Sequence, residues 1–302
     1  MARRPGGDVT DFSGDGIGDV LWRAPDASVW LWDVFSRGAV RSVLLADPFG
    51  FWQPVAVNDL GGDGRADILW QGRDGSVALW EMGGAAVVAS SPLLAPNGFW
   101  RVADAADLTG DGRADILWEG TDGTVGFWEM AGARPVSSAL ILGADRFWRV
   151  AQAADLTGDG RADILWEGAD GSVGLWAMDG PRALGSALVR GANGFWVLLD
   201  VADFNGDNRA DILWEGADGR VELWLMDGGR AVSTAPVIGP NDFWRVAEAA
   251  DFSGDGRADI LWQGLDGTAE VWEMDGARVV ASAFVGFAGS GVVGSYWEPI
   301  TG

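Results

Sequence analysis

The feature that most constrains the fold is an internal repeat of 48 residues that runs through almost the whole chain. An aspartate recurs at this interval, and two tryptophans follow each aspartate at fixed distances. A repeat of this length is typically one supersecondary unit that buries its apolar surface only against neighbouring copies. No linker interrupts the copies, so we expect a single domain over residues 1–302. The aspartates that begin the copies are Asp11, Asp59, Asp107, Asp155, Asp203 and Asp251.

Each copy predicts four short strands and no helix. In the third copy we expect strands at 100–106, 116–119, 125–130 and about 135–141, with Asp122-Gly123 as a hairpin turn. The second of these strands, Ile116-Leu117-Trp118, is apolar on both faces, which suits a sheet covered on both sides. The pattern predicts an all-β fold, a six-bladed β-propeller with four antiparallel strands per blade. A linear solenoid is the alternative, but neither end of the chain has the polar capping repeat that a solenoid needs.

The two ends of the chain predict how the ring closes. The first copy lacks most of its first strand, whereas residues 296–300 form a surplus segment that matches residues 99–103. We expect the first two strands of a copy to be antiparallel. In the third copy, two residues then face each other when their numbers sum to 220, as those of Arg101 and Glu119 do. The same rule pairs Glu298 with Arg23, so we expect the C-terminal strand to complete the first blade.

Nine residues between the first two strands form what we call the Asp loop, in which positions 1, 5 and 9 are acidic in every copy. Position 3 carries an oxygen in five copies, and position 6 is Gly or, in the fifth copy, Asn208, as a sharp turn with positive φ requires. Three carboxylates, the position-3 oxygen and the carbonyl of position 7 make a hard oxygen donor set, which predicts calcium, up to one ion per blade. The alternative is an Asx turn without metal; six clusters of three acids, however, would repel without a cation.

The expected calcium ligands are Asp11, Ser13, Asp15, Ile17 and Asp19; Asp59, Asp63, Arg65 and Asp67; Asp107, Thr109, Asp111, Arg113 and Asp115; Asp155, Thr157, Asp159, Arg161 and Asp163; Asp203, Asn205, Asp207, Arg209 and Asp211; and Asp251, Ser253, Asp255, Arg257 and Asp259. In the second loop Gly61 stands at position 3 and supplies no ligand, so we expect that site to be the weakest.

Charge and composition narrow the function. The net charge of −23 disfavours nucleic acid or an anionic membrane as a partner, and no apolar run is long enough to span a bilayer. Eighteen of the 44 acidic residues lie in the Asp loops, so the acidity is mainly local. The chain has no His, Cys or Lys, which removes the usual general base and two common nucleophiles. We therefore expect a binding module with no catalytic residues.

The Asp loops followed by Ile-Leu-Trp resemble the FG-GAP/VCBS repeats of integrin α-chain propellers and many bacterial surface proteins. The resemblance extends from about Asp11 to Trp297 and implies a structural calcium ion in each loop between the first two strands. It also implies an extracellular or cell-surface location and a partner that is a glycan or a cell-surface protein. The family's Phe-Gly and Gly-Ala-Pro dipeptides are replaced here mainly by Phe-Trp and by Trp-Glu-Gly or Trp-Gln-Gly.

The tryptophans offer a second candidate site. Packing between blades explains most of them, but the series that opens each copy could stack on sugar rings. Those candidates are Trp52, Trp100, Trp148, Trp196, Trp244 and Trp297. The function predicted is therefore a calcium-stabilised, lectin-like carbohydrate-binding module, expected as a monomer. The alternatives are a protein-interaction or adhesion module, and a bare repeat scaffold, natural or designed, without its own ligand.

Overall fold

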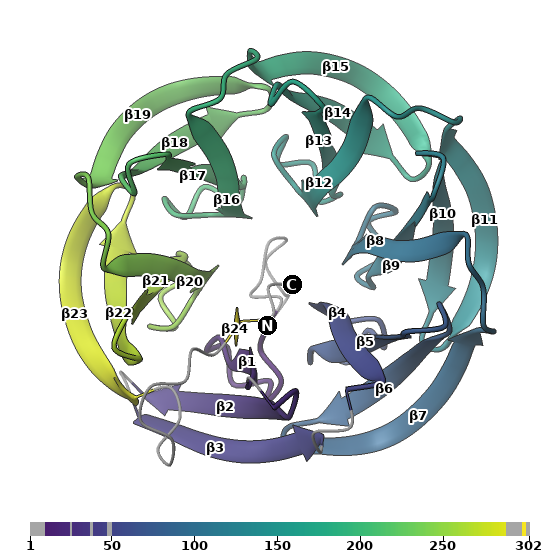
Figure 1. Cartoon of the computed structure of the whole chain (residues 1–302), viewed down its shortest axis with the longest axis horizontal. Helices are drawn as coiled ribbons and strands as arrows, with labels where there is room; N and C mark the ends of the chain where they lie inside the picture. The colour runs from purple at the N-terminus through teal and green to yellow at the C-terminus, as the bar shows by residue number, and fades with distance from the viewer. Residues whose placement is uncertain (1–9, 25, 37–38, 47–49, 288–297, 300–302) are drawn as a thin grey trace.

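The computed structural model describes residues 10–24, 26–36, 39–46, 50–287 and 298–299. The described residues form six antiparallel four-stranded sheets, arranged as the blades of a closed ring (Figure 1). None of these residues is helical, and no helix that could cross a membrane is found among them. The predicted propeller is confirmed, and the solenoid alternative is wrong.

In each blade, four strands lie side by side in order from the axis of the ring to its rim (Figure 1). The six blades consist of β24 (Glu298–Pro299), β1 (Val20–Arg23), β2 (Val29–Ser36) and β3 (Ala39–Ala46); β4 (Trp52–Asn58), β5 (Asp67–Gly72), β6 (Val77–Gly83) and β7 (Ala86–Leu94); β8 (Trp100–Ala106), β9 (Asp115–Gly120), β10 (Val125–Ala131) and β11 (Arg134–Leu142); β12 (Trp148–Ala154), β13 (Asp163–Gly168), β14 (Val173–Asp179) and β15 (Arg182–Arg190); β16 (Trp196–Ala202), β17 (Asp211–Gly216), β18 (Val221–Asp227) and β19 (Arg230–Ile238); and β20 (Trp244–Ala250), β21 (Asp259–Gly264), β22 (Thr268–Asp275) and β23 (Arg278–Phe287). We number these blades 1 to 6 in this order.

The core consists of six apolar clusters, and each of them joins two neighbouring blades. In blade 3, for example, Ile116 and Trp118 pack toward blade 2, whereas Leu117 packs toward blade 4. A strand that is apolar on both faces therefore serves two interfaces, as its sequence predicted. Val20 and Trp22 of blade 1 share a cluster with Phe252 and Leu261 of blade 6, so packing also closes the ring.

The predicted register holds near the start of each innermost strand. Arg101 lies opposite Glu119, and the corresponding pairs are found in blades 2, 4, 5 and 6. In blade 1, Arg23 pairs with Glu298 and Trp22 with Pro299, as expected for a C-terminal strand in this blade. The rest of the surplus segment, 296–297 and 300, lies outside the described residues.

Closer to the Asp loop the register rule is wrong by one residue. A β-bulge between Val102 and Asp104 shifts the pairing, so that Asp104 lies opposite Leu117. The bulge turns Asp104 toward blade 4, where its Oδ2 accepts a hydrogen bond of 2.7 Å from the Ala153 amide. Burial raises the pKa of Asp104 to about 6, against the opposing effect of the hydrogen bonds that its carboxylate accepts. The innermost strands are thus linked across blades by side chains that the register rule did not include.

Candidate functional site

The Asp loop is held in shape by the side chain of its first aspartate. In blade 3, Asp107 Oδ1 accepts hydrogen bonds from the amides of Gly110 (2.6 Å) and Asp111 (3.2 Å), and Oδ2 accepts one from Gly112 (2.8 Å). Gly112 has a φ of 83°, and Asn208, at the equivalent position of blade 5, has a φ of 64°. The predicted sharp turn at position 6, with Asn as a substitute for Gly, is confirmed.

The aspartate at position 9 connects the loop to the third strand of its own blade. Asp115 Oδ2 accepts the amides of Leu108 (3.1 Å) and Thr109 (3.2 Å), and Oδ1 accepts the Met130 amide (3.0 Å). The amide of Met130 lies at a bulge in the pairing of β10 with β11, where it is available to a side chain. All six copies repeat this bond, with donors Val34, Met82, Met130, Met178, Met226 and Met274.

The position-9 carboxylates are buried and titrate far from their usual range. Burial raises the pKa of Asp115 to about 7; the hydrogen bond from Met130 opposes this, and the nearby carboxylates of Asp107 and Asp111 add to it. The same cause raises the pKa of Asp19, Asp211 and Asp259 to about 7, and that of Asp67 and Asp163 to about 6. In every loop the carboxylate at position 1 lies close enough to the position-9 carboxylate to add to this rise in its pKa.

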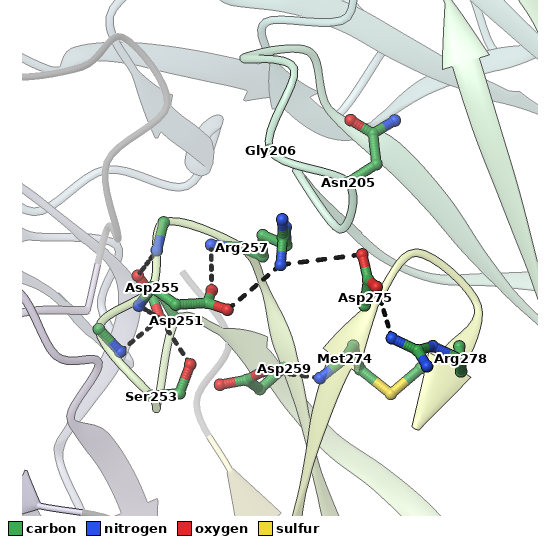
Figure 2. Close-up of polar contacts among 12 residues, drawn as sticks. Asn205, Gly206, Asp251, Ser253, Asp255, Arg257, Asp259, Met274, Asp275 and Arg278 are labelled. Carbon is green, nitrogen blue, oxygen red and sulfur yellow. Dashed lines mark hydrogen bonds and ion pairs between the residues drawn. The ribbon is translucent and has the colours of Figure 1, made fainter. Parts of the chain in front are cut away.

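Positions 5 and 7 interact with each other at the surface. Asp111 Oδ1 accepts the Arg113 amide (2.9 Å), and the Arg113 guanidinium lies 3.6 Å from Asp111 Oδ2. Figure 2 shows the same arrangement in blade 6, where the Arg257 guanidinium lies between Asp255 and Asp275 at 3.5 and 3.7 Å. The sequence predicted only a carbonyl ligand at position 7, so this role of the side chain was not expected. An arginine at that position in five of six loops was the available signal.

Neighbouring loops are joined by a repeated backbone hydrogen bond. The amide at position 8 of one loop donates to the carbonyl of position 1 in the preceding loop, as Ala114 does to Asp59 at 2.7 Å. The bond closes on itself around the ring, because Gly18 of blade 1 donates to Asp251 of blade 6 at 2.8 Å. The six donors are Gly18, Ala66, Ala114, Ala162, Ala210 and Ala258. We call this set the loop relay.

The loops have the donor chemistry of a calcium site. Their oxygens are hard ligands, and the Thr109 hydroxyl at position 3 is buried without a hydrogen-bond partner, which leaves it available to a cation. The position-3 side chain also lies in the right place, because a Cβ on Gly61 would be 3.4 Å from Asp67 Oδ2 and 3.9 Å from Asp59 Oδ1. Among the described residues, however, no three acidic side chains are gathered as ready metal ligands. In blades 3, 4 and 6 the position-5 carboxylate lies instead 3.6, 3.9 and 3.5 Å from the guanidinium at position 7, as the Asx-turn alternative allows.

A second site lies over blades 2, 3 and 4. It is a groove of about 640 Å³, lined by residues at the start of β8 and β12, the ends of β5, β9 and β13, and the loops between them. Its aromatic residues are Phe99, Trp100, Phe147 and Trp148, and its polar residues include Asn97, Arg101, Glu119, Arg149 and Glu167. Arg101 pairs with Glu119 at 2.9 Å, and Arg149 with Glu167 at 2.6 Å.

The groove contains two of the six tryptophans predicted to contact a ligand, Trp100 and Trp148. Trp52 is 39% exposed; Trp100, Trp148, Trp196 and Trp244 are partly buried, and Trp297 lies outside the described residues. The residue before each of the other five tryptophans is a phenylalanine with an exposed ring, 42% in the case of Phe147. It packs edge-on against its neighbour, with ring centroids 5.0 Å apart for Phe147 and Trp148. These phenylalanines were not among the residues predicted to contact a ligand.

The fold and the Asp loops together define a class, a six-bladed propeller with one acidic loop per blade. The family model of the FG-GAP-like repeat matches residues 59–118, 155–214 and 203–262, which is more than half of the chain. Each match begins at the first aspartate of one Asp loop and ends at the Ile-Leu-Trp after the next. The chain belongs to the FG-GAP-like repeat family. No curated protein matches it in sequence.

Solved structures share the fold at low sequence identity. A lectin of Agrocybe aegerita, described as recognising non-reducing terminal N-acetylglucosamine, superimposes with a TM-score of 0.64 at 21% identity, over 96% of this chain and 83% of that one. The WD40 propeller domain of Doa1 gives a TM-score of 0.49 at 17% identity, over 91% of this chain and 82% of its own. The likeness to the lectin concerns the fold alone.

The hydrogen bonds predict different roles for two aspartates of the same loop. Asp115→Ala removes the acceptor of the Thr109 and Met130 amides and one of the two acceptors of the Leu108 amide, so it is expected to lower the free energy of unfolding by about 2–4 kcal/mol. Asp111→Ala removes a surface group and is expected to cost about 0.5 kcal/mol or less in the absence of calcium. Urea denaturation in EDTA measures both, and equal losses would show that the assignment of roles is wrong.

Proposed function

We propose that this chain is a carbohydrate-binding propeller module whose Asp loops are stabilised by calcium. The observation that carries the proposal is the groove over blades 2 to 4, in which exposed aromatic rings lie beside fixed hydrogen-bonding groups. Sugars require this combination, because the apolar face of a pyranose stacks on an aromatic ring while its hydroxyl groups need donors and acceptors.

The polar groups of the groove are held in place. Each Arg–Glu pair joins the first strand of a blade to the second, with Arg101 on β8 and Glu119 on β9. Such a pair presents both donors and acceptors to a hydroxyl group without moving. The lectin that shares the fold over 96% of this chain adds support, because it uses a propeller to recognise a sugar.

Calcium is proposed for the Asp loops as a stabilising ion. The residues that would hold it are the acids at positions 1, 5 and 9 with the position-3 oxygen, for example Asp107, Thr109, Asp111 and Asp115. The ion would supply positive charge next to the position-9 carboxylate, whose pKa is raised by burial and by the nearby carboxylates. Sites of this kind in extracellular modules bind with dissociation constants on the order of 10⁻⁴ to 10⁻³ M, which fits a module that acts outside the cell.

A second candidate function, protein interaction, is favoured by the outer strands. Val88 on β7, Leu140 on β11 and Leu188 on β15 are more than 60% exposed and lie on the rim of the ring. A partner protein could cover such side chains, and apolar surface that gathers into a patch marks interaction sites on proteins. This candidate is preferred if the sugar tests below fail.

Calcium removal tests the role of the loops. EDTA is expected to lower the melting temperature and excess Ca²⁺ to restore it, because an ion that binds only the folded state adds about 2.7 kcal/mol per site at 100 times its dissociation constant. Gly61→Ser should enlarge the calcium-dependent increase, since its hydroxyl would lie between Asp59 and Asp67. Gly61→Ala is the matched control, which adds a Cβ but no oxygen. Identical melting curves in EDTA and in Ca²⁺ would refute the calcium proposal.

Sugar binding is tested with a glycan array followed by calorimetry on the sugars that bind. Phe147→Ser is expected to weaken binding at least tenfold, because it removes a stacking ring from the groove. Phe243→Ser is the control, since Phe243 occupies the same repeat position in blade 6 with similar exposure, 37%, outside the groove. An array on which no sugar binds contradicts the proposal.

A further inference from the structure

Two arginines break the repeat in the groove over blades 2 to 4. Arg73 and Arg146 both line it. No other copy has an arginine at either position: the equivalents of Arg73 are Pro25, Thr121, Ala169, Ala217 and Leu265, and those of Arg146 are Gly50, Gly98, Gly194 and Asp242. In a chain of nearly identical repeats, residues that serve packing recur in every blade. Residues that depart from the repeat and gather in one cavity indicate a function that belongs to that cavity.

These two arginines differ from the other two in the groove. Arg101 and Arg149 are neutralised by Glu119 and Glu167. Arg73 and Arg146 are exposed, and neither forms an ion pair with any residue that the structure describes. The charge of Arg146 does reach Asp122, whose pKa is lowered mainly by hydrogen bonds from Thr124 and only slightly by this arginine.

The remaining acidic residue of the groove lining, Asp145, accepts hydrogen bonds from the backbone. Asp145 Oδ1 accepts the amides of Phe147 (2.7 Å) and Trp148 (3.3 Å). Counting Asp145 and the two ion pairs, the groove lining carries four arginines and three acids. The lining therefore carries one more arginine than acid, in a chain whose net charge is −23. A positive cavity on a strongly acidic protein is selective, because the rest of the surface repels anions.

We propose that the groove binds an anionic saccharide, with Arg73 and Arg146 contacting its carboxylate or sulfate group and the aromatic rings contacting its sugar faces. The inference rests on the proposed carbohydrate-binding function and specifies its ligand class. Guanidinium groups match the planar geometry of carboxylates and form charge-assisted hydrogen bonds with them, which are stronger than those between neutral groups. Phe99, Trp100, Phe147 and Trp148 lie in the same cavity, so one oligosaccharide can meet both kinds of contact.

The test uses substitutions that the repeat itself already contains. Arg146→Gly and Arg73→Ala restore the residues found at the same positions in other blades, Gly194 and Ala217, so neither change is expected to disturb folding. Arg245→Val is the control; it removes an arginine from blade 6, outside the groove, where blade 5 has Val197. All three variants change the net charge by the same amount. The probes are a hyaluronan tetrasaccharide, a chondroitin sulfate tetrasaccharide and neutral chitotetraose, measured by calorimetry at constant calcium.

We expect at least one charged tetrasaccharide to bind the wild-type protein more tightly than chitotetraose, with an affinity that falls as salt increases. Arg73→Ala and Arg146→Gly should each weaken this binding about tenfold, as expected for a lost charge-assisted hydrogen bond, and Arg245→Val should not. Both charged probes carry glucuronate carboxylates and only chondroitin sulfate carries sulfate, so equal affinities indicate recognition of the carboxylate and a higher affinity for chondroitin sulfate indicates recognition of the sulfate.

Two results would overturn the inference in different ways. If chitotetraose binds as tightly as the charged sugars and neither arginine variant matters, the groove recognises neutral sugars and only the anionic specificity is wrong. If none of the probes binds and no sugar binds on a broad glycan array, the carbohydrate-binding function fails together with the inference.

Discussion

The hydrogen bond between the position-8 amide of one Asp loop and the position-1 carbonyl of the preceding loop connects every blade to the next. The residue that accepts this bond with its carbonyl also organises its own loop with its carboxylate, as Asp107 does through three amides. Local loop geometry and blade spacing are therefore fixed by one residue. Because the bond from Gly18 to Asp251 completes the relay, each blade has two neighbours and no sheet is left at an end.

The need to keep the hydrogen bonds of the Asp loops explains which positions of the repeat can differ between blades. Positions 1, 5 and 9 of the Asp loop are acidic in every copy, since each of these carboxylates accepts backbone amides within its blade. Residues near the starts of the innermost strands are not needed to shape the Asp loops. There the facing pair is Gln53 with Gln71 in blade 2, Arg101 with Glu119 in blade 3 and Val197 with Glu215 in blade 5. The loops thus hold the scaffold, and residues near the starts of the innermost strands can differ between blades. The groove is lined by residues of this part of the blades.

Much of the fold was predictable because the sequence repeats its constraints. The 48-residue interval, the strand that is apolar on both faces and the turn residues each indicate the same blade, and agreement among them identifies the architecture. The pairing of Arg23 with Glu298 followed from antiparallel geometry alone. The bulge before Asp104 could not be predicted from the sequence. When both faces of a strand are buried, an inserted residue leaves its pattern of apolar residues almost unchanged.

The site was less predictable, for two physical reasons. An arginine at position 7 can contribute through its carbonyl or its guanidinium, and only distances in the structure, such as that from Arg257 to Asp275 of the same blade, show that the side chain takes part. Aromatic exposure is also a property of packing. The tryptophans proposed as ligand contacts are mostly half-buried between blades, whereas the phenylalanines beside them are exposed. Sequence reasoning located the loops and the Phe-Trp series, but three-dimensional packing decides which atoms of each remain available.

Hydrogen exchange of the six relay amides, followed by nuclear magnetic resonance, tests most directly the claim that the Asp loops hold a closed ring. All six amides, Gly18 included, are predicted to exchange slowly and at similar rates, because each opens only when the ring opens. Rapid exchange at Gly18 beside slow exchange at Ala66, Ala114, Ala162, Ala210 and Ala258 would contradict the account, since it would mean that blades 1 and 6 are not joined as the others are.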